Sequence, residues 1–178
     1  MRRDQLEHAI RTACQIIGHE AVVVVGSQSI LGSFTEDELP SAATMSIEID
    51  VLPLVDDGEE TARLADLIEG VAGEWSPFEE QHGFSIDGVD LNTAVLPDGW
   101  RDRLVKVQNA NTAAPSGQPR FTGWCLDKED LCVAKLCATR SAGTSATGSG
   151  RCGTPTPTWT RWRWPDWARP RPTRRTQA

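Results

Sequence analysis

The first strong pattern along the chain is a run of β-branched residues from Ala21 to Val25 that ends in Gly26-Ser27. A short unbroken apolar run of this kind is typical of a strand buried on both faces. The segment after it, as far as Leu31, can begin a helix, so we expect a strand, a tight turn and a helix N-terminus. Backbone N–H groups at such a terminus point outward and suit a phosphate.

A second strand is predicted by the alternation of polar and apolar residues from Ser46 to Leu52. Side chains of a strand point alternately to its two faces, so Ser46, Glu48 and Asp50 share one face. Two carboxylates on one face can grip a single divalent metal, because hard cations prefer oxygen ligands. Glu48 and Asp50 are therefore candidate metal ligands.

Two amphipathic helices are indicated by apolar residues at helical spacing. One covers residues 4–17 and is closed by Gly18, and the other covers residues 59–73. A further strand or hairpin is indicated by the alternation that leads from Phe84 to Asp87-Gly88. Strands and helices in this order predict an α/β fold, with a short mixed sheet and surrounding helices.

The last patterned segment runs from Trp124 to Arg140. Asp127 is a candidate N-cap, and Asp130 would complete a variant of the capping box. The segment is rich in small and apolar residues, so we expect a largely buried helix. Lys135 is then notable, since lysine is seldom buried without a partner. The alternative is that Lys135 reaches the surface or pairs with a structural carboxylate.

The Gly26-Ser27 turn followed by the strand Glu48-Ile49-Asp50 resembles the nucleotidyltransferase superfamily, which has the polymerase β-like fold. The resemblance is closest to the MenT/AbiEii-type toxin nucleotidyltransferases and extends over most of residues 1–140. Glu48-Ile49-Asp50 stands where the family pattern is Asp-x-Asp, a conservative departure. The resemblance implies Mg²⁺ held by Glu48 and Asp50, and a triphosphate cradled by Gly26 and Ser27.

The same resemblance assigns two further site residues. The third carboxylate of the fold commonly comes from a neighbouring strand, for which Asp87 is the candidate and Asp90 the reserve. A plain turn role for Asp87, before Gly88, stays open. Lys135 resembles a family lysine that approaches the nucleotide phosphates, a task that suits a point charge on a flexible stem.

The activity that this resemblance implies is transfer of a nucleoside monophosphate from an NTP to an acceptor hydroxyl, with release of pyrophosphate. It suggests tRNA 3′ ends as the acceptor and a cognate antitoxin protein as a partner. Two alternatives stay open. One is a small-molecule nucleotidyltransferase of the antibiotic-modifying kind, and the other is a non-catalytic binding protein with the same fold.

Charge and composition limit these readings. The net charge of −7 conceals an acidic body, because residues 1–140 carry 11 Lys/Arg and 24 Asp/Glu. Such a body argues against a large nucleic-acid footprint. The sequence contains no run of eighteen apolar residues, so we predict no membrane span. The residues after Met1 also lack the apolar segment of a signal peptide. Five cysteines without C-x-x-C spacing favour reduced thiols, so we expect a cytoplasmic protein.

The pattern is lost after Arg140. Residues 141–178 contain four Trp and seven Arg but no Leu, Ile, Val, Met or Phe, so they cannot build a core element. We therefore predict a nucleotidyltransferase-like domain over residues 1–140 and a disordered tail over 141–178. We back-translated the segment from Ser141 onward with GC-rich codons and translated it again in the frame that begins one base later. The resulting sequence has a helical pattern, and we therefore interpret the tail as an out-of-frame product. Such a product would lack the family's final acidic motif and be impaired. A natural Arg/Trp-rich arm is the alternative.

Overall fold

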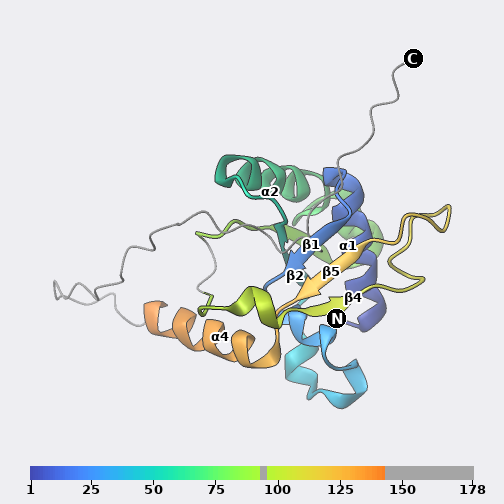
Figure 1. The fold of residues 1–178 in the computed structure, drawn as a ribbon. Helices are drawn as coiled ribbons and strands as arrows, with labels where there is room; N and C mark the ends of the chain where they lie inside the picture. Colours follow the sequence, from blue (N-terminus) through green and yellow to red (C-terminus); the bar gives the residue numbers. More distant parts are fainter. Residues whose placement is uncertain (93–95, 143–178) are drawn as a thin grey trace.

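A five-stranded mixed sheet with helices around it forms the domain (Figure 1). The computed structural model describes residues 1–92 and 96–142, and for residues 138–142 it describes the backbone alone. The predicted α/β class and its short mixed sheet are confirmed. The prediction of a disordered tail falls almost wholly on residues 143–178, which lie outside the described residues.

The elements follow one another along the chain in the order in which they are numbered. The helices are α1 (Arg3–Ile17), α2 (Gly58–Ala72), α3 (Pro77–His82) and α4 (Lys128–Ala142). The strands are β1 (Ala21–Val24), β2 (Glu48–Pro53), β3 (Ser85–Gly88), β4 (Val105–Val107) and β5 (Thr122–Cys125). Short 3₁₀ helices are η1 (Ser27–Gly32), η2 (Glu36–Glu38), η3 (Ser41–Thr44) and η4 (Trp100–Arg103).

The valine strand β1 lies at the centre of the sheet, whose order is β3-β2-β1-β5-β4. It pairs antiparallel with β2 and parallel with β5. At the two ends of this arrangement, β2 pairs parallel with β3, and β5 pairs antiparallel with β4. The helices α2 and α3 make the crossover between the parallel strands β2 and β3, which places the two acidic strands next to each other.

The two faces of the sheet carry separate apolar clusters, as the period of a strand requires. On one face Val22 and Val24 pack with residues of α1 and α2. On the other face Val23 and Val25 pack with Leu52 and neighbouring apolar residues. Both faces of β1 are therefore covered, which is why its sequence is apolar without alternation.

Local signals account for the ends of the first two helices. Gly18 closes α1 with φ of 70°, a left-handed conformation that glycine adopts without steric cost. The side chain of Asp57 caps α2 by accepting hydrogen bonds from two backbone N–H groups. The sequence analysis did not predict α3, although Ser76 caps it and Pro77 occupies its first turn. Among the described helices, none is long and apolar enough to span a membrane.

One expectation about helices was met and one was wrong. The segment after Gly26 does begin a helix, but this helix is η1, a six-residue 3₁₀ helix, so its dipole is small. The described part of α4 is not largely buried, because Val133 is 42% exposed, Leu136 is 66% exposed and Lys135 is exposed. The small and apolar residues of this segment led us to expect a buried helix, but α4 contacts the rest of the domain mainly through its own first turn, which packs near η1.

Candidate functional site

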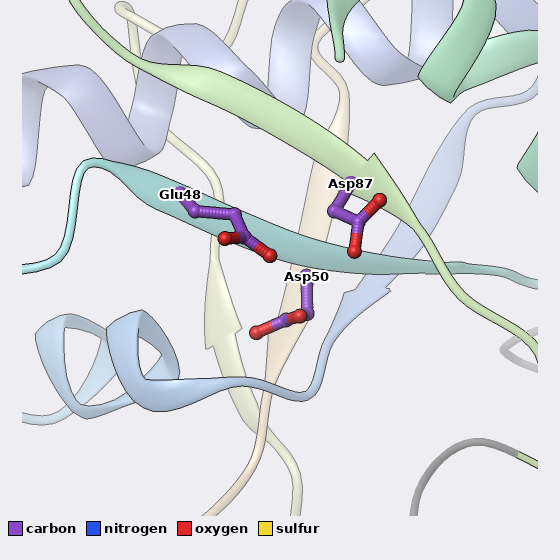
Figure 2. Close-up of side chains that lie close together, drawn as sticks. All are labelled: Glu48, Asp50 and Asp87. Carbon is purple, nitrogen blue, oxygen red and sulfur yellow. The ribbon is translucent and has the colours of Figure 1, made fainter. Parts of the chain in front are cut away.

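Three carboxylates meet on one side of two neighbouring parallel strands (Figure 2). Glu48 and Asp50 come from β2, and Asp87 comes from β3, where it is the register partner of Asp50. One carboxylate oxygen from each residue lies within 4.8 Å of the others. In residues 1–92 and 96–142 no other group of three or more His, Cys, Asp or Glu side chains is placed to hold a metal ion.

Burial of the alternate residues fixes the direction of these side chains. Ile49 and Val51 of β2 and Ile86 of β3 are fully buried on the α1/α2 side of the sheet. Because successive side chains of a strand point to opposite faces, Glu48, Asp50 and Asp87 must point to the other side. A shift of one residue in the register of either strand would bury a carboxylate and expose an isoleucine. The packing of the core therefore determines which face of the sheet carries the three carboxylates.

Gly26 lies directly against Asp50. A Cβ atom on Gly26 would stand 1.4 Å from Asp50 Oδ2, so no other residue fits there without displacing the carboxylate. A backbone hydrogen bond joins the two segments beside this contact, since the Val25 N–H donates to the Asp50 carbonyl over 3.1 Å. The cluster therefore borders the Gly26-Ser27 turn.

Crowding of negative charge shows in the pKa values. Burial raises the pKa of Glu48, and the charges of Asp50 and Asp87 raise it further. Burial also raises the pKa of Asp50, as does the charge of Asp87. A divalent cation removes this kind of repulsion, and three carboxylates are the oxygen ligands that Mg²⁺ prefers. The donor set therefore fits a magnesium ion.

Lys135 of α4 acts on the same group of charges. Its ammonium lowers the pKa of Asp50, which opposes the two raising effects. The side chain itself is exposed, so the structure does not show the buried lysine that the sequence suggested. Lys135 thus stands as an exposed cation near Asp50 of the carboxylate cluster rather than as part of the core.

An ion pair between the partly exposed Arg103 and the buried carboxylate of Asp130 attaches α4 to the rest of the domain. The Arg103 guanidinium donates to both carboxylate oxygens of Asp130, with the shortest bond at 2.7 Å. The Asp130 side chain is 5% exposed. The expected capping role of Asp130 was wrong, because this carboxylate faces Arg103. Asp127 does cap the helix, accepting from the Glu129 N–H over 2.9 Å.

The residues after the turn were missed by the sequence analysis. Gln28 is 1% exposed and Ser29 is fully buried, yet the Gln28 amide atoms and the Ser29 hydroxyl have no hydrogen-bond partner among the described residues. Buried polar groups are nearly always paired, so Gln28 and Ser29 are candidates for contact with a ligand. The polar run Ser27-Gln28-Ser29 directly after the valine strand was the available signal.

Two other candidates lie outside the cluster. Asp90, the reserve for the third carboxylate, follows the end of β3 and accepts hydrogen bonds from the backbone and side chain of Asn92. His82, for which no catalytic role was expected, packs against His8 and Phe78. Both positions have local structural partners.

Comparison with known proteins gives one match. Residues 4–145 match the family described as nucleotidyltransferase of unknown function (DUF6036). No curated protein and no solved structure matches the chain. The family match agrees with the predicted nucleotidyltransferase superfamily, whereas the closer resemblance to the MenT/AbiEii-type toxins stays a prediction.

Proposed function

Since the chain belongs to this nucleotidyltransferase family, we propose that it transfers a nucleoside monophosphate from an NTP to an acceptor hydroxyl at the carboxylate cluster. The observation that carries the proposal is the meeting of Glu48, Asp50 and Asp87 beside the bare backbone of Gly26. Such a site offers oxygen ligands and open backbone at one point, which is what a metal-bound triphosphate needs.

Glu48, Asp50 and Asp87 would hold Mg²⁺. The three oxygen donors and the mutual repulsion that raises the pKa values of Glu48 and Asp50 support this assignment. When bound, the ion would supply a positive charge for the phosphate oxygens and lower the pKa of the attacking hydroxyl. The carboxylates themselves fix the direction from which the acceptor approaches.

Gly26, Ser27 and Lys135 would bind the nucleotide. The first N–H groups of η1 have no earlier turn to pair with, and a side chain at position 26 would close the approach to them. Ser27 adds a hydroxyl donor. The exposed ammonium of Lys135 can follow the triphosphate, whose negative charge is spread over several oxygens.

For the acceptor we propose the 3′ end of tRNA, with the chain acting as a toxin that a cognate antitoxin protein inhibits in the cytoplasm. The resemblance of the Gly26-Ser27 and Glu48-Ile49-Asp50 segments to the MenT/AbiEii-type toxins supports this choice. The acidic body limits the contact to the end of the RNA rather than a long duplex. The alternative acceptor is a small antibiotic-like molecule.

Incubation of the full chain with each labelled NTP, Mg²⁺ and either total tRNA or an aminoglycoside tests the proposal. We expect label on tRNA, and loss of label with Asp50→Asn. Asp90→Asn is the matched control, because Asp90 lies outside the cluster and should leave transfer unchanged. Label on the aminoglycoside alone would show that the acceptor is a small molecule and not tRNA. The absence of transfer with every NTP would overturn the proposed activity.

A further inference from the structure

The outer face of α2 and the turn after it carry two parallel stripes of side chains that nothing in the described domain covers. Leu67, Val71 and Trp75 follow one another at intervals of four residues and are 40%, 48% and 88% exposed. The inner face of α2 is fully occupied, because Leu64 and Ile68 are buried against the sheet. The outer apolar residues therefore do not serve the core of the domain.

Beside the apolar stripe runs an acidic one. Asp66, Glu69 and Glu74 line a shallow groove of about 490 Å³ together with Trp75. Gly70 lies between them, and the space that its missing side chain leaves is open. From residue 64 to residue 80 the sequence has five acidic residues and no Lys or Arg, so no basic neighbour in this stretch neutralises the groove.

The backbone of Trp75 is held in the turn between α2 and α3. Trp75 has φ of 65°, and its N–H donates to the Glu79 carboxylate over 2.6 Å. Glu79 belongs to α3, whose first turn is capped by Ser76. The turn that presents the ring is therefore tied to two helices, and tryptophan is one of the residue types enriched at binding hot spots.

We propose that the outer face of α2, with Trp75 at its end, is a docking surface for a cationic amphipathic helix of a partner protein. The apolar stripe spans about 12 Å along the axis, which matches two to three turns of a second helix. Gly70 allows close approach, and the carboxylates at 66, 69 and 74 lie where lysine or arginine side chains of that helix would flank its apolar face.

Charge argues against a second copy of the chain, nucleic acid and anionic membranes as occupants. A second copy of this chain, bound through the same face, would set the acidic stripe of one copy against that of the other. Nucleic acid and anionic membrane surfaces are repelled by the same carboxylates. Helix α2 lies away from α4, with the sheet between them (Figure 1), so docking there leaves the Lys135 side of the site open, while Glu74 at the end of the groove is near enough to Glu48 to raise the pKa of that carboxyl.

Fluorescence anisotropy of the full chain with a labelled fourteen-residue peptide of Leu and Lys, patterned as an amphipathic helix, tests this proposal. We expect binding that weakens about tenfold with Trp75→Ala, as for an aromatic hot-spot residue. The double change Glu69→Gln/Glu74→Gln should weaken it similarly and reduce its dependence on salt. The same peptide with Glu in place of Lys should not bind.

Matched variants separate the groove from general attraction to an acidic protein. Leu136→Ser removes an apolar side chain that is 66% exposed on α4, and Glu20→Gln/Asp37→Asn removes two exposed charges elsewhere. Both should bind the Leu/Lys peptide as the wild type does. No binding, or equal losses in these controls, overturns the proposal. So does a dimer that Trp75→Ala abolishes, because the face would then belong to a second copy.

Discussion

A Cβ atom on Gly26 would lie 1.4 Å from Asp50 Oδ2, so these two residues sit together only because position 26 has no side chain. The contact joins the Gly26-Ser27 turn to the carboxylate cluster. The backbone that follows β1 therefore borders the Asp50 carboxylate of β2.

Gly26→Ala should therefore displace the Asp50 carboxylate and lower nucleotide transfer by about a hundredfold, the cost of a misplacement of about 1 Å at a reacting centre. Transfer measured at saturating NTP and Mg²⁺ checks this. Gly58→Ala is the control, since a Cβ there meets nothing within 4 Å. Wild-type transfer by Gly26→Ala would mean that Asp50 is not held where the reaction occurs.

Neutralising one carboxylate of the cluster should stabilise the metal-free protein. The pKa of Asp50 is raised by burial and by the charge of Asp87, so its ionised form is disfavoured by folding. Asp50→Asn should add about 0.5–1 kcal/mol to the free energy of unfolding at pH 7, or roughly 1–4 °C in Tm.

The same variant should lose the rise in Tm that Mg²⁺ gives to the wild type. Thermal unfolding with EDTA and with Mg²⁺ measures both effects, and Asp90→Asn should retain the Mg²⁺ effect. A lower Tm for metal-free Asp50→Asn would show that Asp50 has a structural role in place of a strained functional one.

The Arg103–Asp130 pair should control the position of α4. Arg103→Ala leaves a carboxylate that is 5% exposed without its partner, which should cost about 1–3 kcal/mol. It should also raise the KM for NTP, because Lys135 follows α4. Removing both partners is less costly than removing one, so Arg103→Ala/Asp130→Ala should recover part of the stability.

An exposed pair on α2 gives the comparison for this effect. Glu60→Gln breaks a similar ion pair with Arg63, whose side chain is 62% exposed, and should change stability by less than about 1 kcal/mol. Denaturant unfolding and NTP kinetics of the three variants are the measurements. An unchanged KM in Arg103→Ala would separate the ion pair from nucleotide binding.

Stability should fall as the pH drops from 6.5 to about 4 because of His8. Burial lowers the pKa of His8 to about 4, and the charges of Arg11 and His82 act in the same direction, while Asp4 opposes them. In this window the unfolded chain binds more protons at His8 than the folded chain does, so folding weakens as the pH falls. His8→Gln should flatten this part of the profile, measured by denaturant unfolding at each pH. Parallel profiles would refute the assignment.

Patterns confined to one element were enough to predict much of the fold. The valine run to Val25 identified the central strand β1, the alternation around Ile49 identified its neighbour β2, and Gly18 marked the end of α1. The site residues Glu48 and Asp50 came from the same alternation, with their metal role implied by resemblance.

What the sequence hid depends on contacts between distant segments. Asp130 follows Asp127 at the spacing of a capping box, but its partner is Arg103, which no local pattern connects to it. The exposure of α4 could not be predicted from its composition, because apolar residues do not say which surface they will meet. The buried Gln28 was missed for the same reason.

The parallel pairing of β2 with β3 has a consequence for how the protein forms. All three carboxylates lie within residues 48–87, on consecutive strands joined by the two helices α2 and α3, so their meeting needs contacts of moderate sequence separation. Lys135 arrives from a helix that begins only at Lys128, after β4 and β5 have been added. During synthesis the acidic half of the site can thus assemble first, and the cation that completes it is translated last.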